Sequence, residues 1–209
     1  MRTTNCPSCG AAITFQAAVS VLAVCDYCRS TVVRHDLDVR NLGRMAELQA
    51  DGSVLQRGAE GVYRGVHFAV IGRVQLRYPE GLWNEWHLLF DDQRTGWLGE
   101  AQGHYAVSFV TAVAEPVPPF ESLRPGQEVT LDGRPYQVAD RQRAVCVAGE
   151  GELPFQVGPG YEAPVADLTG PAPACATLDY SETPPLVFIG EYIEFDALRL
   201  TGLRAIDGW

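Results

Sequence analysis

Hydrophobic side chains in this 209-residue chain recur mostly at every second position, in short runs that are interrupted by turn residues. Such alternation is typical of half-buried β-strands, whereas helices repeat every three to four residues. No helix longer than a couple of turns is predicted. The pattern therefore predicts a mainly β protein, with strands at 29–34, 62–78, 84–90, 104–113, 128–138, 176–180 and 186–195.

Glycines and prolines mark where these predicted strands turn or bend. Gly65 and the pair Asp132-Gly133 predict hairpin turns. Gly72 interrupts an alternating run and predicts a bulge or bend. The stretch 149–173 is rich in glycine and proline and is predicted to be a long excursion without strands.

Four cysteines near the N-terminus form two Cys-x-x-Cys pairs, Cys6–Cys9 and Cys25–Cys28, separated by fifteen residues. This spacing is typical of a zinc ribbon, in which two tight turns supply four thiolates to one tetrahedral ion. Two disulfides or a redox pair are the alternatives, and they fit the doubled motif less well. We therefore predict a structural Zn²⁺ site, which contributes folding free energy and, having four protein ligands, leaves no open position for catalysis.

Turn residues and composition divide the chain into five segments. A ribbon followed by two small β-barrel or β-sandwich domains is predicted, and the two domains share short motifs, such as Trp97–Glu100 and Phe188–Glu191. Duplication of one β unit or coincidence between hairpins would explain these motifs. The predicted segments are 1–34 (zinc ribbon), 35–57 (connector), 58–114 (first β domain), 115–125 (proline-rich linker) and 126–209 (second β domain).

The charge distribution narrows the possible partners. Residues 116–209 carry six arginines and fourteen acidic residues, and so hold most of the net charge of −10. Because phosphate backbones repel such a surface, nucleic-acid binding is not expected. No signal peptide or membrane span is predicted. Cysteines at the spacing of a metal site favour a reducing compartment, so a cytoplasmic location is expected.

Aromatic and acidic side chains gather in 83–105 and form the first candidate ligand site. An exposed tryptophan beside carboxylates suits a cationic ligand or an arginine-bearing peptide, through cation–π attraction and ion pairing. The alternative is that all three tryptophans are core residues. The candidates are Trp83, Glu85, Trp86, Trp97 and Glu100.

Two further groups carry weaker signals. Glu150 and Glu152 flank a glycine and could form a carboxylate pair for acid–base chemistry, but a solvated turn is the simpler interpretation, because glycine-flanked acids are ordinary loop residues. Cys146 and Cys175 could join a histidine in a second metal site, but no knuckle spacing supports it, so buried apolar positions are expected.

Several of these motifs together resemble a bacterial family of domains of unknown function, number 4178, often preceded by a zinc ribbon. The resemblance implies a β-rich domain with no established activity, and members of the family sit near membrane-associated and polyamine-related proteins. The matching stretches are Cys6–Gly10, Cys25–Ser30, Tyr63–Arg73, Trp83–Trp86, Leu89–Asp92, Gly96–Tyr105, Glu150–Pro154 and Ala176–Tyr180.

The sequence as a whole favours a non-enzymatic adaptor that binds a protein partner or a small cationic ligand. A carboxylate-dependent hydrolase or lyase using Glu85, Glu100 or Glu152 is the first alternative. A nucleic-acid-associated zinc ribbon is the second, with only Arg2, Arg29 and Arg34 as basic residues near the knuckles. The oligomeric state does not follow from the sequence.

Overall fold

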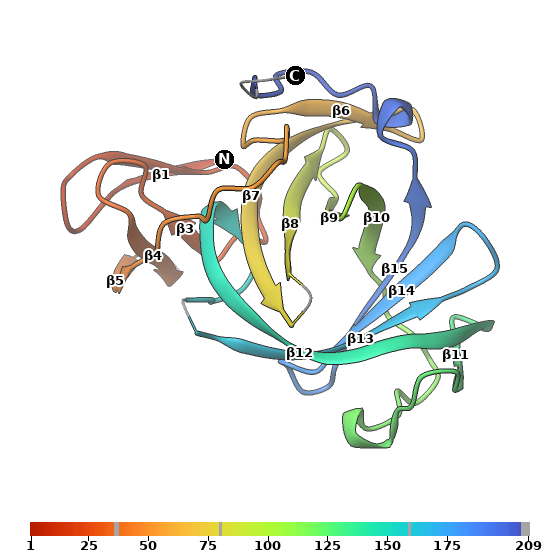
Figure 1. The fold of residues 1–209 in the computed structure, drawn as a ribbon. Helices are drawn as coiled ribbons and strands as arrows, with labels where there is room; N and C mark the ends of the chain where they lie inside the picture. The colour runs from red at the N-terminus through yellow and green to blue at the C-terminus, as the bar shows by residue number, and fades with distance from the viewer. Residues whose placement is uncertain (36–37, 80, 159, 206–209) are drawn as a thin grey trace.

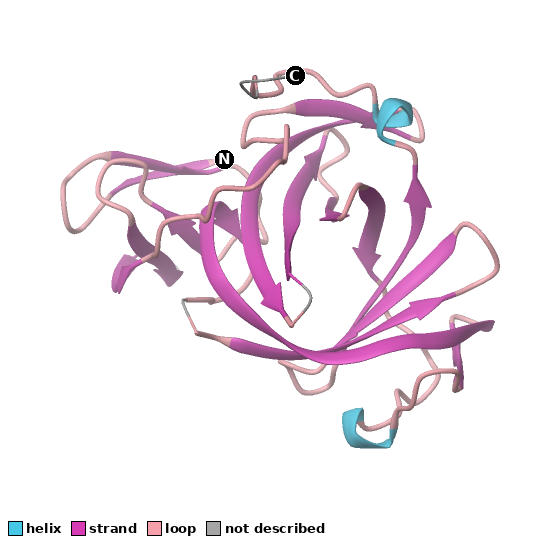
Figure 2. Ribbon diagram, viewed as in Figure 1, coloured by secondary structure: helices cyan, strands magenta, loops and turns pink. Residues whose placement is uncertain are grey.

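The computed structural model describes residues 1–35, 38–79, 81–158 and 160–205, and it confirms a mainly β fold (Figure 2). All strand pairings are antiparallel. The strands are β1 (Arg2–Asn5), β2 (Ala12–Phe15), β3 (Leu22–Val24), β4 (Ser30–His35), β5 (Asp38–Arg44), β6 (Glu60–Tyr63), β7 (Val66–Tyr78), β8 (Gly81–Phe90), β9 (Thr95–Ala101), β10 (His104–Val110), β11 (Glu128–Leu131), β12 (Arg134–Leu153), β13 (Glu162–Thr169), β14 (Ala174–Asp179) and β15 (Leu186–Ile193). The two 3-10 helices are η1 (Phe120–Ser122) and η2 (Phe195–Leu198). Among the described residues, no helix has the length and apolarity that a membrane span requires.

Eight of these strands close into a barrel in the order β7-β8-β9-β10-β15-β14-β13-β12, and β12 pairs back onto β7 (Figure 1). Residues 58–114 and 126–209, which the sequence suggested as two small domains, therefore form one barrel rather than two. Each segment alone has two unpaired strand edges, and each covers the edges of the other through the pairs β10–β15 and β12–β7. Hairpin signals in the sequence report neighbouring strands only, so they do not show this long-range closure.

The two predicted hairpin turns are confirmed. Arg64 and Gly65 connect β6 to β7 with φ values of 50° and 81°, and Asp132 and Gly133 connect β11 to β12 with 50° and 69°. Positive φ at both central residues is the geometry that matches the twist of antiparallel strands. The stretch 149–173 contains more structure than predicted, because β12 runs on to Leu153 and β13 lies inside it.

Alternation along the barrel strands separates an inner from an outer face. In β13, Val165 and Asp167 face the interior, whereas Ala166 and Leu168 belong to an outer apolar cluster. The predicted bulge at Gly72 is confirmed by a register shift between Val70 and Gly72. The bulge changes the face of the following residues, so that β7 contributes to the outer side before it and to the interior after it.

Two apolar clusters cover the outer face of the barrel. One lies between β8–β10 and the segments β6 and η2, and it includes Trp86, Leu88 and Leu198. The other lies against β11 and the predicted linker, and it includes Leu131 and Leu178. Packing on the outside therefore supplies much of the hydrophobic core, at about 25 cal/mol for each Å² of apolar surface removed from water.

The N-terminal module continues the barrel's sheet on one side (Figure 1). β1 and β2 form a separate hairpin, and β3, β4 and β5 join the large sheet through the pairing of β3 with the end of β12. The sheet of the ribbon extends beyond residue 34, because residues predicted as connector form β5.

Candidate functional site

The four N-terminal cysteines meet where the two knuckle turns face each other. Their sulfur atoms all lie within 4.8 Å of one another, with Cys6 Sγ 3.6 Å from Cys28 Sγ and Cys9 Sγ 3.7 Å from Cys25 Sγ. All four are free thiols. A tetrahedral ion with metal–sulfur bonds of about 2.3 Å requires sulfurs about 3.8 Å apart. The cluster can therefore hold one metal ion, and the alternative of two disulfides is excluded in this structure.

Backbone geometry prepares both knuckles in the same way. The N–H of Gly10 donates to the carbonyl of Cys6 (2.8 Å), and the N–H of Arg29 donates to that of Cys25 (2.9 Å). Gly10 and Arg29 both have positive φ, at 78° and 60°. Hydrogen bonds with Ser30 lower the pKa of Cys28 to about 6, whereas desolvation and hydrogen bonds with the other three thiols raise the pKa of Cys9 to about 12. The thiolate that metals require is therefore favoured at Cys28 and not at Cys9.

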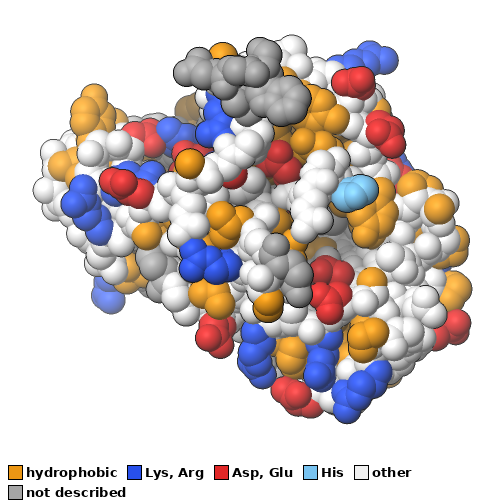
Figure 3. All heavy atoms as spheres, in the orientation of Figure 1, with side chains coloured by type: hydrophobic (Ala, Val, Ile, Leu, Met, Phe, Trp, Pro, Cys, Tyr) orange, Lys and Arg blue, Asp and Glu red, His pale blue; other side chains and the backbone are white. Residues whose placement is uncertain are grey.

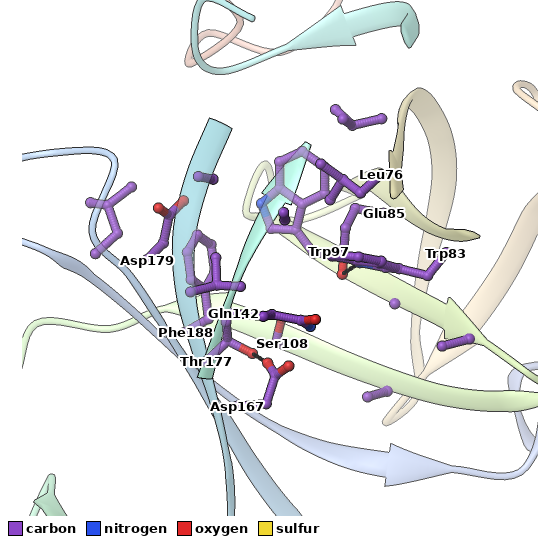
Figure 4. Close-up of a pocket in the computed structure, with 18 of the residues that line it drawn as sticks. Leu76, Trp83, Glu85, Trp97, Ser108, Gln142, Asp167, Thr177, Asp179 and Phe188 are labelled. Carbon is purple, nitrogen blue, oxygen red and sulfur yellow. Dashed lines mark hydrogen bonds between the residues drawn. The ribbon is translucent and has the colours of Figure 1, made fainter. Parts of the chain in front are cut away.

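The interior of the barrel is a second candidate site, a cavity of about 430 Å³ that alternate residues of its strands line (Figure 4). Polar side chains from five strands point into it. Aromatic rings from three strands, and from the loop between β12 and β13, form much of its wall. Acidic side chains gather beside the hollow on the surface over the barrel (Figure 3). The polar residues include Glu85, Ser108, Gln142, Asp167 and Thr177, with the further acids Glu100, Asp140, Asp179 and Glu182 also in the lining, and the aromatic ones include Trp83, Trp97, Phe155, Tyr161 and Phe188.

Two of the carboxyl groups that line this cavity, those of Glu85 and Asp167, have a raised pKa. Trp83 Nε1–H donates to Glu85 Oε1 (3.0 Å), and Thr177 Oγ1–H donates to Asp167 Oδ1 (2.8 Å). Burial raises the pKa of Glu85 to about 7 and also raises that of Asp167, and the charge of Asp167 adds to the shift at Glu85. Among the described residues that line the cavity, none is an arginine or a lysine, and His104 lies exposed at its edge. The two carboxylates therefore have no cationic partner here.

Gly99 leaves the space beside Glu85 open. A Cβ atom placed on Gly99 would lie 3.5 Å from both carboxylate oxygens of Glu85. Trp97, two residues earlier on β9, stacks on Phe155 with ring centroids 5.6 Å apart. A bound group can therefore contact the carboxylate and an aromatic ring from one position.

The structure brings together three of the predicted site residues, Trp83, Glu85 and Trp97, in the cavity. Trp86 lies on the other face of β8, fully buried, and its Nε1–H donates to Glu100 Oε2 (2.9 Å). Glu100 also accepts hydrogen bonds from Asn84 and Tyr105, so its oxygens are already occupied at the edge of the cavity.

The predicted pair of acids on β12 does not face this cavity. Glu150 lines a small pocket beside Arg57 and Arg73. The carboxylate of Glu152 accepts the backbone N–H groups of Gln16 (2.8 and 2.9 Å) and Ala17 (3.2 Å), so it joins the ribbon to the barrel.

The two remaining cysteines are buried, as expected from the sequence. Cys146 lies in an apolar cluster between ribbon and barrel, and Cys175 lines the cavity. Burial raises the pKa of Cys146 to about 11 and that of Cys175 to about 12. Neither belongs to a group of metal-binding side chains within the described part of the chain.

Sequence reasoning missed Asp167, the second carboxylate of the cavity. It lies on β13, inside the stretch that was predicted to have no strands. The signal that could have indicated a strand is the polar Asp167 between the apolar residues Ala166 and Leu168.

Comparisons with known proteins support the family assignment and nothing beyond it. The family model described as a domain of unknown function, DUF4178, matches residues 56–195, a range that includes all eight strands of the barrel. Neither the curated proteins nor the solved structures contain a match to the chain.

Proposed function

The chain belongs to the DUF4178 family, and we propose that its barrel is a non-enzymatic receptor for a small organic cation, with a structural zinc ion in the attached ribbon. The observation that carries the proposal is the pair of half-buried carboxylates in the cavity, Glu85 and Asp167, which have no basic partner among the described residues that line it. The chain would act as an adaptor whose binding state depends on the ligand, in the cytoplasm and in a membrane-associated or polyamine-related system.

Physical chemistry favours a cation as the occupant. A carboxylate out of water is costly unless a positive charge or hydrogen-bond donors compensate it. Within the described part of the chain, Glu85 has one side-chain donor, Trp83, and Asp167 has one, Thr177. A ligand with an ammonium group would supply the missing charge, and the ring of Trp83 would attract the same group by cation–π interaction.

Zinc is the metal we propose for the cysteine cluster. Four thiolates with tetrahedral edges of 3.6 and 3.7 Å form the closed ligand set of structural zinc sites. Metal binding then contributes the free energy that folds a module too small to have a large core of its own.

The proposal is tested by calorimetric titration with benzylammonium, which combines an ammonium group with an aromatic ring. Benzyl alcohol, which has nearly the same shape and no charge, is the control ligand. We expect benzylammonium to bind more tightly than the alcohol, and more tightly at pH 8 than at pH 5.5, because the pKa of Glu85 is about 7.

Glu85→Gln should weaken benzylammonium binding about tenfold or more, the equivalent of about 1.4 kcal/mol. The matched control is Glu128→Gln, because Glu128 is an exposed residue of β11 outside the cavity. Equal affinity for the cation and the alcohol, or equal affinity of the two variants, would refute the receptor proposal.

A carboxylate-dependent hydrolase or lyase is the second candidate. It is favoured by the pKa of Glu85 near 7, which suits proton transfer, with a second carboxyl group in the same enclosure. Incubating a metabolite extract with the protein and with Glu85→Gln distinguishes the two functions by mass spectrometry. Depletion of a compound far beyond the amount of protein, only with the unmodified chain, would indicate catalysis; stoichiometric retention would indicate a receptor.

A further inference from the structure

We propose that the ribbon packs behind the cavity wall and supports it, and that metal binding in the ribbon and cation binding in the barrel strengthen each other through Glu152, His87 and Trp97. This inference rests on the proposed function for its ligand, but its structural basis is independent of the ligand's identity.

The first connection is a continuous sheet. Glu152 and Leu153, at the end of β12, pair with Ala23 and Leu22 of β3. The N–H of Val21 donates to the carbonyl of Leu153 (3.0 Å). The same strand β12 carries Gln142 into the cavity, so one strand connects the ribbon's sheet to the cavity.

The second connection is the carboxylate of Glu152, which is only 3% exposed. It accepts the N–H groups of Gln16 and Ala17, in the loop that leads from the first knuckle's hairpin to the second knuckle. These two N–H groups, bound to one carboxylate, hold the loop against the barrel.

The third connection runs from the backbone of the same residue into the cavity. The Nδ1 atom of His87 lies 3.0 Å from the carbonyl oxygen of Glu152. Since a carbonyl only accepts, Nδ1 carries the proton, and burial lowers the pKa of His87 to about 4, so the ring is neutral. His87 stacks on Trp97 at a centroid distance of 5.0 Å, and Trp97 lines the cavity.

The approach of β12 to His87 depends on Gly72, which is paired with His87 in the neighbouring strand. A Cβ atom on Gly72 would lie 2.0 Å from the carbonyl oxygen of Glu152. Any residue with a side chain at position 72 would therefore push the carbonyl of Glu152 away from His87.

Apolar packing provides the fourth connection. One buried cluster contains residues of the ribbon together with residues of the barrel wall, so the two modules share a core. Its ribbon members are Leu22, Val24, Val33 and Met45, and its barrel members are Val74, Trp97, Cys146, Leu153 and Val157. Loss of ribbon structure would expose one side of this cluster and loosen the wall that holds Trp97.

These connections have a thermodynamic consequence. If metal increases the affinity for the cation by some factor, the cation must increase the affinity for the metal by the same factor. We expect a factor of about ten, within the usual range for coupled sites. The cation affinity of the barrel then depends on whether the ribbon holds metal. This dependence gives the ribbon a role besides folding.

The experiment compares the full chain loaded with Zn²⁺ and the same chain stripped by a chelator under reducing conditions. Benzylammonium affinity is measured in both states by calorimetry. Hydrogen exchange with mass spectrometry follows peptides from 84–101 and 145–157, with 120–131 as the distant reference. We expect about tenfold weaker binding without zinc, and lost protection in the first two regions but not in the reference region.

The outcomes separate the two proposals. Equal benzylammonium affinity with and without zinc would overturn the coupling and leave the receptor function intact. If benzylammonium binds in neither state, the receptor proposal fails, and exchange alone decides the coupling: protection lost in 84–101 supports it, and loss confined to the ribbon overturns it.

Glu152→Gln tests the positioning residue, since it keeps the side chain's size and one acceptor oxygen. It should lower both the zinc affinity, measured by competition with a chromophoric chelator, and the benzylammonium affinity of the zinc-loaded protein. Glu128→Gln should change neither. Unchanged affinities in Glu152→Gln would overturn the assignment of Glu152 as the connecting residue.

Discussion

Replacing Glu85 by Gln should stabilise the protein at alkaline pH, although it removes a group proposed to bind ligand. Burial and the nearby charge of Asp167 raise the pKa of Glu85 from 4.5 to about 7. Ionised Glu85 is therefore less favourable in the folded barrel than in the unfolded chain. Glutamine has nearly the same shape, and its carbonyl oxygen can still accept the hydrogen bond from Trp83 Nε1–H.

The size of the effect follows from the pKa shift. Below about pH 4.5 the carboxyl group is protonated in both states, and its shift costs nothing. Between pH 4.5 and 7 the folded state holds the proton that the unfolded state has lost, so stability falls as pH rises. Above pH 7 the full cost applies, at about 1.4 kcal/mol for each pKa unit, or about 3 kcal/mol as an upper limit. Asp167, whose pKa is also raised, acts in the same direction.

Urea unfolding followed by circular dichroism, at pH 4.5 and pH 8, measures this difference. We expect Glu85→Gln to match the unmodified protein at pH 4.5 and to exceed it at pH 8, with Glu128→Gln unchanged at both. A variant that is destabilised at pH 8, or stabilised equally at both pH values, would show that Glu85 is not a strained carboxylate and would refute the reasoning.

Three further predictions concern other parts of the molecule. Asp51→Ala removes the carboxylate paired with the Arg73 guanidinium, whose side chain is only 3% exposed, and should lower the free energy of unfolding by about 3–5 kcal/mol in urea titrations; a loss below about 1 kcal/mol would contradict a buried ion pair. Gly99→Leu should fill the space beside Glu85 and abolish benzylammonium binding while the circular dichroism spectrum is retained; retained binding would place the ligand elsewhere. Cys9→Ser should lower bound zinc well below one equivalent in elemental analysis and expose the ribbon to hydrogen exchange; full zinc occupancy would contradict four-cysteine ligation.

The metal cluster could be predicted because its information is local. Each Cys-x-x-Cys turn fixes the positions of two sulfurs. The fifteen residues between the two turns are few enough to bring them together. The same holds for the hairpins at Gly65 and Gly133, where two residues determine the turn. In each case the chain segment that forms the feature is short enough for the sequence pattern to specify it.

The cavity could be predicted only in part because its residues are distant in the chain. Trp83, Glu85 and Trp97 lie on neighbouring hairpin strands and were expected to be close. Asp167 reaches them only after the barrel closes through β12–β7 and β10–β15, and no short-range pattern records these pairings. Alternation within β8 places Trp86 on the opposite face from Glu85. It does not say which of the two faces becomes the interior of the barrel, so the burial of Trp86 on the outside could not be predicted.

The location of the hydrophobic core explains how a small barrel can keep polar groups inside. An eight-stranded barrel is narrow enough for side chains to fill it completely. Here the outer face packs against β6, η2, β11 and the linker, so Trp86 and Leu178 are buried outside the barrel. Because stability is supplied there, the interior is free to hold Glu85 and Asp167 at a cost in folding free energy. A site that is unfavourable when empty, within a fold held together elsewhere, would favour the proposed cation, because the ligand's charge would recover the cost.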